Sequence, residues 1–538
     1  MKEILENLET SSIGYRALVD RYTLKVNPHF RWSFIIKRGA RRVLQDRFPL
    51  IYLYDQAYAL DNPADPFQHL TFALKHEGLN LEIIAAFFTY MTPREVQEHI
   101  AKNAAGKYER ILWFLYETLT KQLLDIQDLT QGSYIDLLDD DLYYTGKPIT
   151  HRRYRVNDNL LGNSNFCPFV RRTDFLKNIE EKKLDQLVRS IIKEYEQNVL
   201  DRASVYLYAQ ETMSSYQIER EQPSKQRIAR FIQLIKKAEY AVPLTKEMLI
   251  ELQNSVVDAR FINKTYRSTQ NYVGQTRDWH QQIVHYISPK PEDVDDLMQG
   301  LFDSLARMFE SDIHPVVTAA AISFGFVFIH PFDDGNGRLH RFLIHYVLHQ
   351  TGFTPQGMIF PVSAVILLDM LQYTQALERF SKPLMTLITN YNLDEQGKLV
   401  VHQKTNSLYR YLDYTAQAEY LATCIEKTIQ TDFKKELRYL VNYDKAKKEL
   451  QKIVDMPDRL IDLFINLVMQ NKGILSEPRK QKHFSMLTDS EVKKMESVIN
   501  QLLSDVSRPW SPDNFFVSIS YKPSILFFLY QKSLLLKK

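Results

Sequence analysis

Residues 330–341 read His330-Pro331-Phe332-Asp333-Asp334-Gly335-Asn336-Gly337-Arg338-Leu339-His340-Arg341. An apolar run at 316–329 leads into this stretch, and a segment rich in Leu, Phe and Ile follows at 342–348. An apolar periodic segment on each side of a glycine-containing turn predicts helix, tight loop, helix. We expect this unit to form the centre of the fold.

The glycines and arginines of this stretch predict an anion-binding site. Gly335 and Gly337 allow backbone amides to approach a ligand closely, and the helix that follows offers unpaired N–H groups and a positive dipole end. Arg338 and Arg341 lie three residues apart, so on a first helical turn they share a face and can clamp phosphate oxygens. Two arginines favour a polyphosphate ligand.

The remaining polar residues supply a metal ligand and a base. Asp334 precedes the glycines, where its hard carboxylate oxygens can hold magnesium between phosphates. A histidine has an unperturbed pKa near 6.5, so a neutral imidazole at His330 can take the proton of an attacking hydroxyl. The predicted reaction is phosphoryl or nucleotidyl transfer.

The stretch matches the pattern His-x-Phe-x-Asp/Glu-Gly-Asn-Gly-Arg-x-x-Arg at every specified position, and the chain thus resembles Fic-domain proteins. The resemblance implies a helical fold that uses magnesium and ATP to move AMP onto a protein hydroxyl, releasing pyrophosphate. It assigns the general base to His330 and the magnesium ligand to Asp334. It further assigns the α-phosphate anion hole to Asn336 with the amides beside it, and contacts to the outer phosphates to Arg338 and Arg341.

A second resemblance concerns regulation. Many Fic proteins carry an inhibitory helix with Ser/Thr-x-x-x-Glu followed by Gly or Asn, and this chain has Ser215 and Glu219 at that spacing. The resemblance implies that Glu219 pairs with Arg341. Arg341 is then no longer available to bind the γ-phosphate of ATP. Arg220 departs from the pattern, and Glu221 is a rival carboxylate. The alternative interpretation is a solvated helix with mixed charges.

A hairpin is predicted ahead of the loop. Residues 263–274 and 282–287 combine β-branched and aromatic residues with nearby turn formers, which is typical of a β-hairpin. In Fic proteins a flap at this place, 266–287 here, binds the target segment as an added strand. The alternative is a purely structural ribbon. A helix with an acidic first turn is expected from residue 292 onward.

Composition sets broad limits. The chain has 538 residues, 45% of them hydrophobic, and a net charge of +3. This length predicts two to four domains, and the balanced charge gives no support for a nucleic-acid partner, although it does not exclude one. Two cysteines without paired spacing, Cys167 and Cys424, fit a reducing compartment. No apolar run reaches 18 residues, and no signal-like start is evident. We therefore expect a soluble bacterial cytoplasmic protein without a membrane span.

Scarce glycine, 16 residues in all, and long periodic segments predict a mainly α fold. We expect a helical Fic core with a small β-hairpin flap, flanked by largely helical regions. The predicted divisions are an N-terminal region at 1–200, the catalytic core at 201–387 with the inhibitory helix near 215–219, and a helical C-terminal region at 388–538.

Three other patterns have both a structural and a functional interpretation. The basic and aromatic stretch at 30–42 is interpreted as a solvated helix face, with a nucleic-acid or acidic-partner contact as the alternative. The arginines at 152–155 are interpreted as a basic loop, with a DNA contact as the alternative. His345 and His349 are four residues apart but have no third ligand at useful spacing, so a packing role is predicted.

Three functions follow from these patterns. The first is a protein adenylyltransferase held inactive by Glu219, which acts on an unidentified target protein docked on the flap. The second keeps the fold but uses another nucleotide donor or removes AMP. The third is a non-catalytic nucleotide-binding regulator or scaffold.

Overall fold

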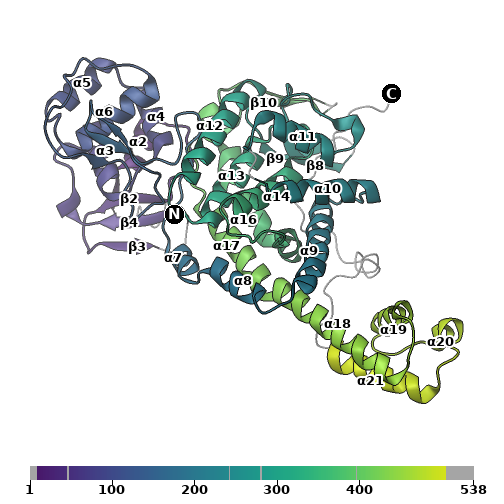
Figure 1. The fold of residues 1–538 in the computed structure, drawn as a ribbon. Coiled ribbons are helices and arrows are strands. Elements are labelled where there is room, and N and C mark those ends of the chain that lie inside the picture. The colour runs from purple at the N-terminus through teal and green to yellow at the C-terminus, as the bar shows by residue number, and fades with distance from the viewer. Residues whose placement is uncertain (1–8, 45–47, 241–242, 279–280, 395–396, 504–538) are drawn as a thin grey trace.

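The computed structural model describes residues 9–44, 48–240, 243–278, 281–394 and 397–503 (Figure 1). Helices dominate these residues and the sheets are small, which confirms the mainly α prediction. Most of the buried apolar side chains form two large clusters. One draws almost entirely on residues 15–169, and the other on residues 144–503. The chain is therefore organised around an N-terminal core and a larger second core.

The N-terminal core packs helices against a four-stranded sheet of order β1-β2-β4-β3, in which β2 and β4 are parallel and the outer pairs antiparallel. The strands are β1 (Thr10–Ile13), β2 (Arg31–Ile36), β3 (Arg42–Leu44) and β4 (Leu50–Tyr54). The helices are α2 (Tyr15–Tyr22), α3 (Pro66–His76), α4 (Leu81–Phe88), α5 (Pro93–Ala101) and α6 (Lys107–Thr120).

The structure corrects the helix predicted for the stretch at 30–42. Its first part is β2, an inner strand in which Trp32 and Phe34 are both buried. A near-continuous apolar run is typical of a strand covered on both faces. The same short run beside basic residues also fits one side of a helix, which is why the sequence favours the wrong element here. Arg31, the first residue of the strand, donates Nε to the Glu77 carbonyl at 3.1 Å. This basic side chain therefore makes an intramolecular hydrogen bond.

A small sheet and two helices connect the two cores. They are β5 (Ile135–Asp136), β6 (Ile149–His151) and β7 (Val156–Asp158), then α7 (Asp174–Glu181) and α8 (Leu184–Ile192). Arg153 pairs with Glu117 at 3.0 Å, and Arg155 donates to the Gly132 carbonyl at 2.6 Å. These contacts support the basic-loop interpretation, since both side chains hold the loop to its own domain.

The second core contains the helix-loop-helix unit, and both of its predicted helices are confirmed. Every residue of α13 after Pro315 is buried, as are Asn336 to Leu348 of α14. The surrounding elements are α9 (Gln197–Ile218), α10 (Lys225–Lys237), α11 (Lys246–Val256), β8 (Tyr272–Asp278), β9 (Gln281–Ile287), α12 (Pro291–Phe309), α13 (Pro315–Ile329), α14 (Asn336–Gln350), α15 (Val362–Leu368) and α16 (Met370–Leu387).

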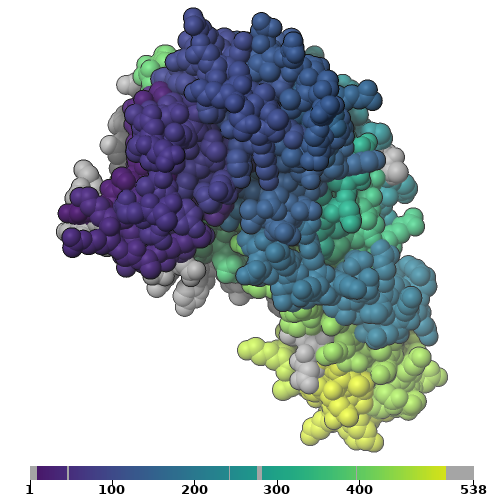
Figure 2. Space-filling model, turned by 90° about the vertical axis from the view of Figure 1, so that its left-hand side faces the viewer, coloured from purple at the N-terminus to yellow at the C-terminus, as the bar shows by residue number. Residues whose placement is uncertain are grey.

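The C-terminal elements first complete this core and then leave it. Helix α17 packs against α13 and α18 packs against α9, and α18 to α21 extend as a separate projection (Figures 1 and 2). The elements are β10 (Tyr391–Leu393), β11 (Leu399–Val401), α17 (Thr415–Thr428), α18 (Lys434–Ile453), α19 (Asp458–Gln470), α20 (Glu477–His483) and α21 (Asp489–Leu503). None of the described helices combines the length and apolar character that crossing a bilayer requires.

Candidate active site

His330 ends helix α13 in a left-handed conformation, with φ 54° and ψ 58°. Its side chain is buried, and Nδ1 lies 3.1 Å from the Val327 carbonyl oxygen. Because a carbonyl can only accept, this contact places the ring hydrogen of neutral His330 on Nδ1 and the lone pair on Nε2. The predicted base is thus held in one tautomer, with Nε2 as the proton acceptor.

The loop after His330 is closed by a side chain of its own. Asn336 donates Nδ2 to the Phe332 carbonyl at 2.7 Å and accepts from the Phe332 amide through Oδ1 at 3.0 Å. The Phe332 ring is fully buried. The Asn336 side chain therefore shapes the loop, and its backbone N–H is the group left to face an anion at the start of α14.

Both glycines lie in close contact with neighbouring side chains. Gly335 has φ 90°, and a Cβ atom there would lie 3.0 Å from Val257 Cγ1. A Cβ atom on Gly337 would lie 2.1 Å from Glu219 Oε1. The Glu219 carboxylate thus lies directly against the first turn of α14, where the sequence predicts an anion cradle.

Arg341 is engaged by the end of α9. It donates Nε to Ser215 Oγ at 2.6 Å and Nη2 to Glu219 Oε1 at 2.6 Å, and its side chain is 1% exposed. Burial raises the pKa of Glu219, while the Arg341 and Arg338 guanidiniums oppose that shift. The structure therefore brings together the three residues of the predicted inhibitory contact, and the ionised state of Glu219 depends on the two arginines.

Arg338 has a carboxylate partner in the same segment. Its Nη2 lies 3.1 Å from Glu221 Oε1, and Nη1 donates to the Val256 carbonyl at 2.8 Å. Glu221 also accepts from Arg227 Nη2 at 2.7 Å. The rival carboxylate noted in the sequence consequently does not compete with Glu219 but contacts the other arginine of the motif.

Asp334 lies at the partly exposed edge of the loop, with 32% of its side chain accessible. Its Oδ1 accepts from the Gly335 amide at 2.6 Å and from Arg338 Nη2 at 3.1 Å. No group of three or more His, Cys, Asp or Glu side chains able to hold a metal occurs in the described part of the chain. A single accessible carboxylate beside a phosphate cradle fits magnesium, which usually takes one or two carboxylates and completes its shell with phosphates and water.

The predicted hairpin is confirmed as β8 and β9, which pair antiparallel from Tyr272 opposite Ile287. It begins later than expected, because residues 266–271 precede the first strand, and Arg267 and Asn271 among them bond to the loop at 330–332. The side chains at the tip, 276–281, lie outside the described residues. Binding of a target strand to this flap stays a prediction.

Several residues that hold the loop were missed in the sequence. Arg267 donates to the His330 carbonyl at 2.8 Å, Asn271 to the Phe332 carbonyl at 3.2 Å, and Gln253 to the Asp334 carbonyl at 3.2 Å. None belongs to the motif, and each acts on backbone atoms more than 60 positions away. These contacts could not be predicted from the sequence, because every residue has a backbone carbonyl and the residue types do not show which carbonyl a distant side chain will bind.

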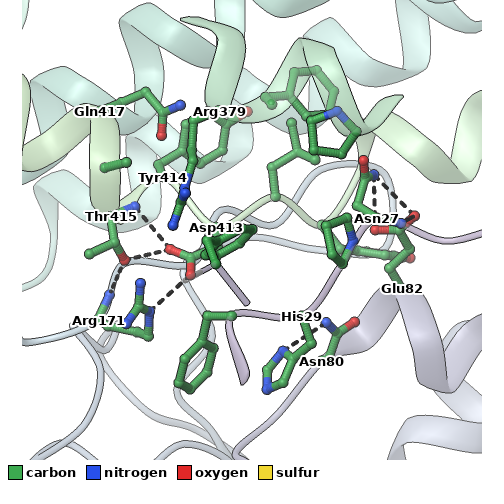
Figure 3. A pocket seen from close by; sticks show the side chains of 18 of the residues that line it. Asn27, His29, Asn80, Glu82, Arg171, Arg379, Asp413, Tyr414, Thr415 and Gln417 are labelled. Atoms are coloured by element: carbon green, nitrogen blue, oxygen red, sulfur yellow. Dashed lines mark hydrogen bonds and ion pairs between the residues drawn. The ribbon is translucent and has the colours of Figure 1, made fainter. Parts of the chain in front are cut away.

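A separate pocket of 140 Å³ lies where the N-terminal core meets the second core (Figure 3). Arg171 pairs with Asp413 at 2.9 Å on one side, and the Asn27 amide donates to Glu82 at 2.9 Å on the other. Burial raises the pKa of Glu82 to about 7. Phe328 of α13 lines the pocket too, two residues before His330 in the sequence.

Comparison with known proteins identifies the region that carries this site. Residues 243–348 match the Fic/DOC family. Two relatives are named protein adenylyltransferase Fic. The one from Nematostella vectensis is 37% identical over 90 residues, which are 17% of this chain and 19% of the relative. The one from Drosophila willistoni is 38% identical over 90 residues, 17% of this chain and 16% of the relative.

The matched region is a small part of each protein. The chain spans less than a fifth of the length of these curated relatives. A solved structure of a Fic domain containing signaling protein from Bacteroides thetaiotaomicron aligns with a TM-score of 0.34 and 18% identity, covering 49% of this chain and 97% of that one. The bacterial origin of the present chain stays a prediction, because the two curated relatives are animal proteins.

Proposed function

We propose that this chain, whose residues 243–348 form a Fic/DOC family domain, is a self-inhibited protein adenylyltransferase that moves AMP from ATP to a hydroxyl of a target protein. The observation that carries the proposal is the joint arrangement of the loop. The first turn of α14 and Arg341 lie side by side with the Glu219 carboxylate against both, and the loop that leads into this turn begins at His330.

In the proposed reaction, His330 Nε2 takes the proton of the target hydroxyl. The hydroxyl oxygen then attacks the α-phosphorus of ATP, and the bond from that phosphorus to the bridging oxygen breaks, so that pyrophosphate leaves. The first turn of α14 holds the charge that develops on the α-phosphate oxygens. Arg338 and Arg341 bind the outer phosphates and so orient the leaving group.

Magnesium, when bound, would neutralise charge that develops on the leaving phosphates. Asp334 would hold it, because its carboxylate is accessible at the edge of the cradle. The bond from the Gly335 amide to Asp334 Oδ1 keeps the carboxylate beside the loop.

Self-inhibition is proposed to come from two carboxylates. Glu219 forms an ion pair with Arg341, and Glu221 forms one with Arg338. In this conformation neither guanidinium can therefore bind the outer phosphates of ATP. One charged hydrogen bond to a phosphate is worth about 1.5 to 3 kcal/mol, a factor of about 10 to 150 in productive binding. The resting protein is therefore expected to label targets weakly.

The test is incubation of wild type, Glu219→Gly and Glu219→Gly/His330→Ala with magnesium and α-labelled ATP. We expect the single variant to label itself and proteins of a cell lysate about 10 to 150 times faster than wild type, and the double variant to lose that labelling. Glu310→Gly is the matched control, because Glu310 caps α12 with nearly the same backbone geometry, and its exposed side chain lies on a surface shared with Lys177 and Asp312.

The outcomes separate the possible functions. If Glu219→Gly transferred label from another nucleotide but not from ATP, that nucleotide would be the donor in place of ATP. If the protein instead removed AMP from a labelled protein, its function would be deAMPylation. No transfer by any folded variant, from ATP or other nucleotides, would overturn the proposal and favour a non-catalytic regulator. Equal stimulation by Glu310→Gly would contradict inhibition through Arg341.

A further inference from the structure

We infer that Arg267 is a positioning residue that couples the flap to His330. The inference deepens the proposed function and rests on it. Arg267 lies just before the flap and is 3% exposed. Its side chain reaches the catalytic loop and both ends of the flap at once, so docking of a target strand and placement of the His330 imidazole depend on the same guanidinium.

The contacts of Arg267 divide between these two elements. Toward the loop, Nε donates to the His330 carbonyl at 2.8 Å and the backbone amide donates to the Pro331 carbonyl at 2.9 Å. Toward the flap, Nη1 donates to the Thr269 carbonyl at 2.9 Å and Nη2 to the Pro289 carbonyl at 2.5 Å. One residue therefore ties the base of both flap strands to two consecutive carbonyls of the loop.

Neighbouring flap residues continue this row of bonds. The Tyr286 hydroxyl donates to the Phe328 carbonyl, and Asn271 Nδ2 donates to the Phe332 carbonyl. The bonded carbonyls thus run from the last turn of α13 to the middle of the loop. The Phe328 carbonyl lies in the last turn of α13 and the other three lie in the loop beyond it, so the helix supplies no N–H partner for them. Residues at the base of the flap donate to all four, and Asn336 also donates to the Phe332 carbonyl.

The chemistry of Arg267 fits a positioning role. None of the described carboxylates lies within ion-pair distance of it, and burial lowers its pKa to about 10. Burying a cation that is satisfied by carbonyl oxygens alone is costly, so the side chain is held by geometry and not by an ion pair. Its planar fork matches several carbonyls at fixed angles, which a lysine cannot reproduce.

His330 gives this geometry a functional consequence. A non-glycine residue at φ 54° is strained and persists only where its surroundings hold it. The Arg267 bond to the His330 carbonyl supplies part of that constraint. If it is lost, the imidazole is expected to leave the position from which Nε2 meets the target hydroxyl, whereas the amides of α14 stay in place.

The test compares Arg267→Lys and Tyr286→Phe, each in the Glu219→Gly background. We would measure the rate of self-labelling at saturating ATP and the Kd of α-labelled ATP by equilibrium dialysis. We expect Arg267→Lys to lower the rate about 10- to 100-fold, since small displacements of a catalytic group cost rate steeply, with the Kd within about threefold of the parent. Tyr286→Phe removes one hydroxyl and is expected to lower the rate less.

Arg110→Lys is the matched control. Arg110 is also buried and donates to the Tyr154 and Ser133 carbonyls, at 2.9 and 2.8 Å, but it lies in the N-terminal core. We expect it to lose thermal stability without losing rate. Deuterium exchange of the peptide 328–334 should accelerate only in the Arg267 variant.

Each outcome decides the inference. An unchanged labelling rate in folded Arg267→Lys would overturn it, as would a Kd that weakens by the same factor as the rate, because the whole loop would then have collapsed. A rate loss in Arg110→Lys equal to that of Arg267→Lys would also count against it. Absence of labelling in the Glu219→Gly parent would overturn the proposed function itself, and the inference with it.

Discussion

Arg220 is the residue at which this chain departs from the inhibitory pattern, and its backbone explains what the pattern requires. Helix α9 ends at Ile218, Glu219 caps it, and Arg220 follows with φ 56°. The Glu221 amide bonds to the Tyr216 carbonyl and the Arg220 amide to the Gln217 carbonyl, which is the Schellman turn that usually places glycine at this position. Arginine keeps the turn, and the turn is what carries Glu219 and Glu221 to different arginines of the motif.

Replacing Arg220 by glycine is therefore expected to preserve inhibition. Glycine adopts this conformation without steric cost, so the free energy of unfolding should rise by about 1 kcal/mol. Thermal unfolding and the labelling assay would be run together, with Lys121→Gly as control because Lys121 ends α6 at φ 60°. If Arg220→Gly released labelling as strongly as Glu219→Gly, the arginine would have to take part in inhibition directly.

At the scale of elements, α9 and α14 are joined along one face of each. Glu211, Ser215 and Glu219 are spaced by four residues on α9, and they meet His345 and Arg341 on α14. Glu211 Oε1 lies 2.9 Å from His345 Nε2, and Glu211 Oε2 accepts from the amide of Ser363 at the start of α15. His345 thus has a structural role, as the sequence predicts. Glu211 anchors the helix two turns before Glu219.

Loosening this anchor should weaken inhibition. Glu211→Gln replaces one of the two carboxylate oxygens that contact His345 and Ser363, and it is expected to lower the free energy of unfolding by about 1 to 3 kcal/mol. It should also raise the labelling rate above that of wild type. Glu117→Gln is the control, since Glu117 is an equally buried carboxylate bonded to Trp113 and Arg153 in the N-terminal core. Two variants with similar losses of stability and no difference in labelling would show that α9 is held by other contacts.

The limits of sequence reasoning also appear at this scale. The helices and the loop at 330–341 were predictable because their chemistry is local and apolar periodicity marks both flanks. The strand at 31–36 was not, because a short apolar run bounded by basic residues fits a helix face as well as an inner strand. The contacts of Arg267 with His330 and of Glu211 with His345 depend on tertiary packing, which no local pattern encodes.

At the scale of the whole molecule, the interface between the two cores includes backbone hydrogen bonds. The Cys167 amide bonds to the Arg410 carbonyl at 2.8 Å and the Phe169 amide to the Leu412 carbonyl at 2.9 Å. Asn27 bonds both to Glu82 and to the Leu408 carbonyl, the latter at 3.0 Å. Glu82, 3% exposed, therefore places an ionisable group at the junction itself, next to the pocket of Figure 3.

The charge of Glu82 is expected to make this junction sensitive to pH. Burial raises its pKa from the ordinary 4.5 to about 7, so the folded state favours the uncharged form. The stability that this group contributes is complete below about pH 4.5 and is lost as the pH rises through about 7. Glu82→Gln stays uncharged, and it should exceed wild type in free energy of unfolding by about 1 to 3 kcal/mol at pH 8, with the difference shrinking toward pH 5.

Calorimetry of both proteins at pH 5, 6, 7 and 8 would measure this difference. Comparing the two proteins is essential, because burial lowers the pKa of His29 to about 3 and gives a pH dependence of opposite sign. His29 is common to both, so its contribution cancels. Glu98→Gln, on the exposed face of α5, should show no such trend. A constant difference between Glu82→Gln and wild type from pH 5 to 8 would mean that Glu82 is already ionised at pH 5, and that its bonds to Asn27 outweigh its burial.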